Sequence, residues 1–334
     1  MVASAEADRG SARSRDQPKG ATVTTAVLRT VDAWWVRKGT RAARIDTTAT
    51  TTRELLADRE TIDAAASSSD TLPIEGLRLL SPVTAPCRIV ATMANYASHA
   101  KDTAVDPRRV PLTFFRKASG SISGPFDDIV KPGHISLLDY EVEVGLVIGR
   151  DLAVGATIAD ANLSDYIAGL VVTNDVSARD LQLTKTQFYE AKSYPTFTPV
   201  GPALVLLDAD ELQRFGDLRL RLRVNGQLRQ DMVVAGDIIY PPLHVLQGLA
   251  QFQQLDAGDL VLTGTPVGTA LSAPPRPVER LASVLSTPTR LRLFFARQSR
   301  NRKYLHEGDV VETSIATDDK SIDLGAQRTV VRFA

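Results

Sequence analysis

The sequence predicts an α+β fold that is mostly β, with its strands packed as a sandwich or roll. From Cys87 onward, apolar runs of strand length follow one another with turn residues between them. The Asn225-Gly226 pair lies between two alternating segments, which is the pattern of a β-hairpin with a type I′ turn. Long helical patterns are few. Sheets of this kind bury their apolar faces against a second layer, so we expect a layered, strand-rich body.

The amino-terminal elements predict a small α/β domain over residues 21–82, with a boundary near Pro82. Its expected elements are a hairpin over 26–45 that turns at Lys38-Gly39, a helix over 52–66 begun by a threonine cap, and a strand over 77–80. A domain of about sixty residues is too small to carry much chemistry alone. The chemistry is therefore expected in the rest of the chain.

Residues 83–334 are expected to form the larger domain. Its strand candidates are 88–93, 140–148, 167–173, 203–207 and the hairpin 218–230. The arginines at 219, 221 and 223 alternate with leucines, which is typical of a solvated strand face and not of a nucleic-acid site. Residues 241–253 predict a helix with Leu243, Leu246, Leu249 and Phe252 on one apolar side.

Bulk composition excludes several classes of partner. The 39 basic and 39 acidic residues balance, so there is no general electrostatic attraction to nucleic acid or to a membrane surface. Cys87 is the single cysteine, which excludes an intrachain disulfide and a zinc site built on several thiolates. Residues 1–20 mix both charge signs without an apolar run, so we expect a disordered tail and not a signal peptide. The default location is the cytoplasm.

Two glutamates in the segment LDYEVEVGLVIGR are the first candidate site residues. In a strand, side chains at i and i+2 point to one face, so Glu141 and Glu143 project together, opposite Val142 and Val144. Two carboxylates this close repel each other. Either that face is solvated, or a cation lies between them.

A second acidic position follows another apolar strand, in GLVVTNDVSARDLQ. Asp175 at the end of that strand, beside the two glutamates, can complete a metal site made only of oxygen ligands. Mg²⁺, Mn²⁺ and Ca²⁺ favour such ligands. Asp180 is interpreted more simply, as a helix cap or as the local ion-pair partner of Arg179.

Six segments occur in an order that resembles the catalytic domain of the fumarylacetoacetate hydrolase family. They are DYEVEVGLVIGR, NDVSARDLQ, AKSYPTFTPVGP, VNGQLRQ, GDLVLTGTPVG and LHEGDVVETSI, and the resemblance covers about residues 85–334. It implies a mixed β-sandwich roll, usually a homodimer, that binds one divalent metal ion and a small keto-acid substrate.

The resemblance also implies roles for single residues. Glu141, Glu143 and Asp175 would bind the metal ion, with Mg²⁺ expected and Mn²⁺ or Ca²⁺ as alternatives. Lys192 would be catalytic and stabilise negative charge on a substrate oxygen. Residues near the substrate would be Lys117, Arg179, Gln182 and Thr265, and Arg179 has the alternative role of a structural bridge between carboxylates.

The segment ANYASHAKD matches the family's lid, where a histidine and a glutamate form a general-base pair. His99 stands at the histidine position, but Asp102 stands where the glutamate is expected, and its side chain is one methylene shorter. A second departure is an insert over about 270–304, which could form a helical hairpin over the site or at a dimer interface.

The predicted activity is metal-dependent hydrolysis of a C–C bond in a small, acylpyruvate-like diketo acid through a metal-stabilised enolate. The alternative is a non-hydrolytic member of the family, meaning a hydratase, an isomerase or tautomerase, or a decarboxylase. The aspartate at 102 raises this alternative. A catalytically silent scaffold is the remote third interpretation, since all three carboxylates and Lys192 are present.

Overall fold

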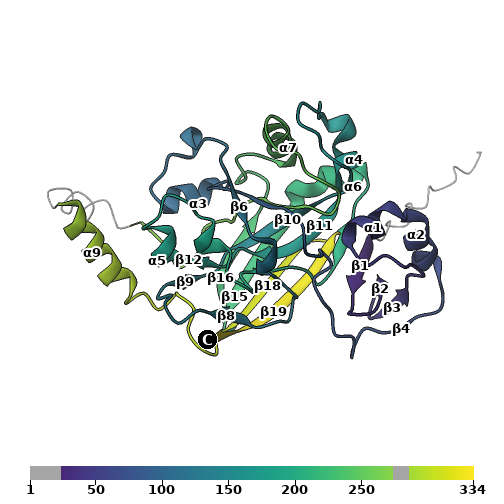
Figure 1. The fold of residues 1–334 in the computed structure, drawn as a ribbon, viewed down its shortest axis with the longest axis horizontal. Helices are drawn as coiled ribbons and strands as arrows, with labels where there is room; N and C mark the ends of the chain where they lie inside the picture. Colours follow the sequence, from purple (N-terminus) through teal and green to yellow (C-terminus); the bar gives the residue numbers. More distant parts are fainter. Residues whose placement is uncertain (1–23, 274–285) are drawn as a thin grey trace, which may run out of the picture.

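Two β-sheets packed face to face form the body of the protein in a computed structural model, which describes residues 24–273 and 286–334 (Figure 1). The larger sheet has the order β4 (Leu72–Pro73), β3 (Arg41–Arg44), β2 (Trp34–Lys38), β1 (Thr25–Arg29), β14 (Leu204–Leu206), β11 (Ile167–Asn174), β10 (Val142–Ile148), β17 (Leu260–Leu262), β5 (Ile89–Thr92), β6 (Phe114–Lys117). The smaller sheet has the order β16 (Gln227–Val233), β15 (Leu218–Val224), β18 (Val310–Thr317), β19 (Asp323–Phe333), β8 (Ile129–Lys131).

Short elements connect and cover these sheets. Two short strand pairs are β9 (Leu138–Asp139) with β12 (Ser177–Ala178), and β7 (Ile122–Ser123) with β13 (Thr198–Pro199). The α-helices are α1 (Thr52–Ala57), α2 (Arg59–Ser67), α3 (Ala97–Asp102), α4 (Leu163–Tyr166), α5 (Arg179–Gln182), α6 (Ala209–Gln213), α7 (Pro242–Ala250) and α9 (Thr287–Gln298). Single 3₁₀ turns are η1 (Pro107–Arg109), η2 (Ser119–Ser121), η3 (Asp160–Asn162), η4 (Glu190–Lys192) and η5 (Arg214–Asp217). The strand-rich α+β prediction is confirmed.

The two central strands of the large sheet, β10 and β11, are buried on both faces. One face packs against β15, β18 and β19 of the smaller sheet, where Val144 and Leu222 belong to the same apolar core. The other face belongs to a second core with Val147, Val171 and Leu260. Every residue of β10 is therefore buried, and polar groups on this strand must find partners inside the protein.

The amino-terminal strands extend the large sheet. β1 pairs antiparallel with β14, with Ala26 opposite Val205, and α1 and α2 contribute Leu55 and Ile62 to the second core. The predicted hairpin turn at Gly39 is confirmed between β2 and β3. The domain boundary near Pro82 stays a prediction.

Three local predictions differ from the structure. The helix expected over 52–66 is two helices, because Asp58 ends α1 and its carboxylate caps α2. A threonine caps the first helix as predicted, and this residue is Thr51. Residues 77–80 form no strand in the part of the chain that the structure describes, and Leu80 makes only an isolated bridge to Arg29. Helix α7 ends at Ala250, so Phe252 is 62% exposed and does not share its buried face.

The hairpin formed by β15 and β16 matches its prediction. Asn225 and Gly226 both have positive φ, as a type I′ turn requires. The leucines of β15 are buried, and the alternating arginines lie on the outer face, where Arg219 pairs with Asp318 and Asp231. The solvated-face interpretation of these arginines is confirmed.

Helix α9 is the described part of the insert expected over 270–304. It stands away from the body at the end opposite to the amino-terminal strands (Figure 1). Its Phe295 packs against Leu137, Ala270 and Tyr304 at its base. Residues 274–285 of the expected helical hairpin and the tail expected over 1–20 lie outside the described residues. Within the described ranges, no helix is both long and apolar enough to cross a membrane.

Candidate active site

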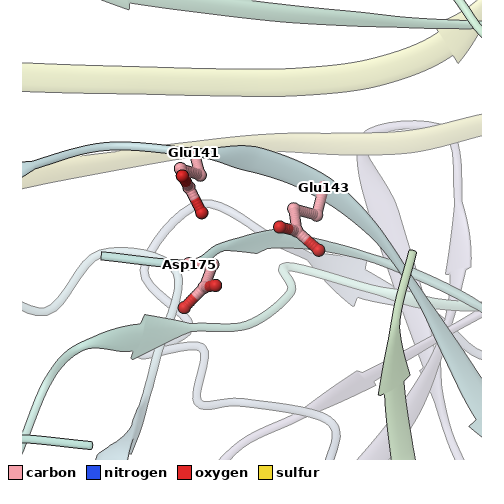
Figure 2. A group of neighbouring side chains, drawn as sticks. All are labelled: Glu141, Glu143 and Asp175. Carbon is pink, nitrogen blue, oxygen red and sulfur yellow. The ribbon is translucent and has the colours of Figure 1, made fainter. Parts of the chain in front are cut away.

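Three carboxylates meet at the end of the central strand pair, inside the protein. Glu141 directly precedes β10, Glu143 is the second residue of β10, and Asp175 comes directly after β11; Figure 2 shows their side chains gathered in one place. One oxygen from each lies within 4.8 Å of the others. Their exposures are 5%, 2% and 0%, so the solvated-face alternative for the glutamates is wrong.

Antiparallel pairing brings these residues together. Val142 lies opposite Asn174 in the register of β10 and β11, so Glu141 and Asp175 are neighbours across the strands. The Asp175 backbone N–H donates to the Glu141 carbonyl at 2.8 Å, and the Glu141 N–H donates to the Asn174 Oδ1 at 2.9 Å. The predicted cluster therefore rests on the rigid centre of the large sheet.

Three buried cations contact this cluster. Lys192, from η4, donates to Glu141 at 2.5 Å and to Asp175 at 2.6 Å. Lys117, at the end of β6, donates to the other oxygen of Asp175 and to the Phe197 carbonyl at 2.9 Å. Arg179 opens α5 and donates to Glu141 at 2.5 Å. Each carboxylate oxygen of Glu141 and Asp175 thus has a cationic partner.

Glu143 is compensated differently. Its Oε2 accepts the backbone N–H of Gly264 at 2.7 Å, and no lysine or arginine of the described residues pairs with it. Gly264 has φ +88, and a Cβ there would lie 2.9 Å from the Asn95 Cβ, so a glycine suits this close approach. Burial, with the charges of Asp175 and Glu141, raises the pKa of Glu143 well above its usual value.

The neighbouring groups have pKa values shifted by the same charges. Burial alone raises the pKa of Glu141, but Arg179 and Lys192 hold it well below its usual range. Burial lowers the pKa of Lys117 despite the charge of Asp175. Burial also opposes the charge of Lys192, yet Asp175 and Glu141 raise its pKa. Positive charge is therefore concentrated at Glu141 and Asp175 and is lacking at Glu143.

This arrangement suits a divalent cation. The donor set is all carboxylate oxygen, which hard cations prefer. Four buried carboxylates, Asp139, Glu141, Glu143 and Asp175, face three buried cations, Lys117, Arg179 and Lys192, so one negative charge is uncompensated when all are ionised. A buried, unpaired carboxylate is costly, and a proton or a metal ion at Glu143 removes that cost.

His99 lies in α3 and lines the same cavity as Glu141 and Lys192. Its Nδ1 is buried and has no hydrogen-bond partner among the residues that the structure describes. Burial lowers the pKa of His99, so its imidazole is neutral at pH 7. A neutral imidazole with a free nitrogen can accept a proton.

Asp102, at the end of α3, does not pair with His99. Within the described part of the chain, its carboxylate makes no hydrogen bond or ion pair, and its backbone carbonyl accepts the N–H of Ala273 at 3.0 Å. The general-base pair that the sequence suggested is therefore not formed in this structure. A catalytic role of Asp102 stays a prediction.

Arg179, Gln182 and Thr265 line the same cavity of about 310 Å³. Gln182 accepts from Arg179 at 2.7 Å, and Thr265 donates to the Val142 carbonyl at 2.9 Å. Lys117 does not line the cavity, because its side chain is fully buried against Asp175. Asp180 accepts the Ser136 N–H and makes no ion pair with Arg179, so that local pairing was wrong.

Sequence reasoning missed Asp139 and Gln230. Asp139 is 0% exposed and accepts from Arg179 at 2.8 Å. It lies two positions before Glu141, so the two-residue period of a strand would have predicted Asp139 on the same face as the two glutamates. Gln230 is buried between Val142 and Thr265, and it donates to the Thr265 hydroxyl at 2.8 Å. It is the last residue of the segment VNGQLRQ, one of the six that carry the family resemblance, and that position was the available signal.

Comparisons with known proteins agree with this geometry. The family model described as fumarylacetoacetate (FAA) hydrolase C-terminal matches residues 88–332. The oxaloacetate tautomerase Fahd2a, mitochondrial, of Rattus norvegicus is 34% identical over 213 residues, which are 64% of this chain. The match spans 66% of the rat protein, just under two thirds of its length.

Solved structures share the fold. A probable 2-hydroxyhepta-2,4-diene-1,7-dioate isomerase from Mycobacterium abscessus superposes with a TM-score of 0.70 at 27% identity, covering 93% of this chain and 99% of that one. Maleylpyruvate hydrolase from Sphingobium sp. SYK-6, solved with manganese(II) and pyruvate, has a TM-score of 0.67 at 22% identity, covering 92% and 99%. The latter likeness supports the fold alone. With the family model matching most of the chain, the protein belongs to the fumarylacetoacetate hydrolase family.

Proposed function

We propose that the protein is a divalent-metal-dependent enzyme that interconverts the keto and enol forms of a small 2-keto acid. One observation carries the proposal: His99 lines the same cavity as Glu141 and Glu143, and Glu143 has no cationic partner in the described chain. The carboxylate triad supports metal binding, and the histidine supports proton transfer.

Glu141, Glu143 and Asp175 would hold the metal ion. When bound, that ion supplies positive charge that stabilises an enolate oxygen. Lys192, which contacts Glu141 and Asp175, adds a second positive charge beside the same oxygen. Arg179 keeps Glu141 in place and does not need to touch the substrate.

His99 moves the proton. Its imidazole accepts a proton from the carbon next to the keto group and returns it to the keto oxygen, which gives the enol and a neutral histidine; the same transfers in reverse order give the keto form. Enolisation needs only this one base. The lack of a contact between His99 and Asp102 favours a reaction without an oriented, activated water. The rat relative is named as a tautomerase, which agrees with this choice.

C–C hydrolysis of an acylpyruvate-like diketo acid is the second candidate. The His99 imidazole supports it too, because a neutral imidazole can take a proton from water as well as from carbon. In that reaction water adds to the distal carbonyl, the C–C bond breaks, and a carboxylic acid and the enolate of pyruvate are released. Both candidates share the enolate, so the fold does not decide between them.

The test begins with protein stripped by EDTA and then supplied with Mg²⁺ or Mn²⁺. Acetylpyruvate and oxaloacetate are followed by NMR, with Glu143→Gln as the metal-binding control. Metal-dependent acceleration of enol–keto exchange without new products supports the first candidate. Metal-dependent release of pyruvate with acetate moves the assignment to hydrolysis. No metal-dependent change with either compound contradicts both candidates.

The nature of the metal ion, with Mg²⁺ expected, stays a prediction. The homodimer and the cytoplasmic location expected from the sequence stay predictions too.

A further inference from the structure

Part of the lining of the cavity beside the carboxylates is apolar, and we call this part the apolar wall. It includes Met93, Val105, Val110, Phe115, Phe188 and Leu271. They come from the loop after β5, the segment around η1, β6, the segment before η4 and the start of the insert. Five separate parts of the chain thus contribute apolar residues to the lining of this cavity.

An aromatic pair begins this wall next to the charged cluster. The ring of Phe115 lies 5.4 Å below the Lys192 Nζ, measured to its centroid. The ring of Phe188 meets Phe115 edge to face at a centroid distance of 5.6 Å. A substrate held at the carboxylates would meet the first of these two rings beside Lys192.

The cations that line the cavity are already engaged. Lys192 pairs with Glu141 and Asp175, and Arg179 pairs with Asp139 and Glu141. No other lysine or arginine of the described ranges, 24–273 and 286–334, lines the cavity. A carboxylate placed against the apolar wall would lose hydration without gaining a cationic partner among the described residues, which is strongly unfavourable.

We propose that the substrate carries an uncharged, apolar group, alkyl or aryl, at the end remote from its 2-keto-acid group. This inference rests on the proposed function, because it takes the keto-acid end to lie at the carboxylates. It distinguishes this chain from a protein acting on oxaloacetate, whose far end is a second carboxylate. The determinants of the preference are Phe115 and Phe188.

A matched pair of ligands tests the preference without requiring turnover. The two probes are 2-oxoheptanoate and 2-oxoheptanedioate, which differ only in a terminal methyl or carboxylate. Their binding to the full-length, Mn²⁺-loaded protein is measured by calorimetry. We expect the neutral-ended probe to bind about 100-fold more tightly, as discrimination by an unpaired buried charge implies.

A substitution then tests which wall is responsible. In Phe188→Arg, a cation enters the wall, and the preference for the neutral-ended probe should shrink by about tenfold or more. Tyr189→Arg is the matched control, since Tyr189 is the next residue, is 53% exposed and does not line the cavity. The control should keep the preference of the unmodified protein.

The outcomes separate the two proposals. Tight binding of both probes with equal affinity, or a preference for the dicarboxylate, overturns the inference and leaves the proposed function intact. Metal binding without binding of either probe overturns the proposed function, and the inference falls with it. A clear preference that Phe188→Arg and Tyr189→Arg alter equally removes Phe188 from the determinants and contradicts the assignment of the wall.

Discussion

Arg179 donates from Nε to Oδ2 of Asp139 at 2.8 Å, and both side chains are almost completely buried. The same guanidinium donates to Glu141, so Asp139 positions a carboxylate of the proposed metal site through Arg179. Asp139 also accepts the backbone N–H groups of Ala270 and Leu271. One carboxylate therefore ties the charged cluster to the cavity wall at the start of the insert.

Replacing Asp139 with asparagine should destabilise the protein by about 3 kcal/mol, because the buried Arg179 keeps its charge and loses a partner. Urea unfolding of the metal-free protein measures this. Asp180→Asn is the matched control, since Asp180 adjoins Arg179 but does not pair with it, and it should cost less than about 1 kcal/mol. Similar losses in both variants would contradict the bridging role of Arg179.

Glu141 and Glu143 should respond to substitution in opposite directions. Glu143→Gln removes an uncompensated carboxylate, so the metal-free protein should be as stable as before or more stable. Glu141→Gln leaves Arg179 and Lys192 each short of a buried partner and should cost about 3 kcal/mol.

Both substitutions remove a proposed metal ligand. Calorimetry with Mn²⁺ should show a loss of affinity of about 100-fold or more in each variant, while unfolding curves separate them. Equal stability of Glu141→Gln and Glu143→Gln without metal would show that the cations do not favour one glutamate. Unchanged Mn²⁺ affinity in both would exclude the triad as the metal site.

Metal binding should release a proton from Glu143. Its pKa is raised in the folded protein, so near that pKa a proton competes with the metal ion, and the apparent affinity should fall as the pH falls. Calorimetry in buffers of different ionisation enthalpy counts the protons released. The expected number approaches one below the raised pKa and falls toward zero above it.

The same shift gives the metal-free protein a pH-dependent stability. A raised folded-state pKa contributes stability below the unfolded value of about 4.3, and this contribution is lost as the pH rises through the folded pKa. Glu141 acts oppositely, because its pKa is lowered, and its contribution is lost only as the pH falls below about 4.3. Glu143→Gln should remove the contribution of Glu143, so the stability of the variant should fall less, or rise more, with pH above about 4.3 than that of the unmodified protein.

His99→Ala should lower turnover by about 100-fold or more without changing Mn²⁺ affinity, because His99 is a base and not a metal ligand in the proposed mechanism. Asp102→Asn should change turnover less than about threefold, since Asp102 does not contact His99. Rates with acetylpyruvate and Mn²⁺ titrations of both variants check this. A loss in Asp102→Asn as large as that in His99→Ala would instead indicate that the two residues pair during the reaction.

Local pattern accounts for much that the structure contains. The turn at Asn225-Gly226 follows from two positions that need positive φ, and the alternation of β15 follows from one solvated face. The shared direction of Glu141 and Glu143 also follows from a two-residue period. The prediction of a single helix over 52–66 was wrong because Asp58 is a second helix-capping residue, and it begins a new helix inside that range.

Contacts between segments that are distant in the sequence determined the features of the site that local pattern did not predict. The sequence by itself determined a strand-rich fold and a set of acidic residues able to hold a cation, because strand period and residue chemistry are local properties. Tertiary structure decided that Glu143 lacks a cationic partner among the described residues, that His99 and Asp102 are not paired, and that Phe115 and Phe188 meet beside Lys192. These relations join segments distant in the chain, and burial between packed sheets sets their energies, which a local pattern does not encode.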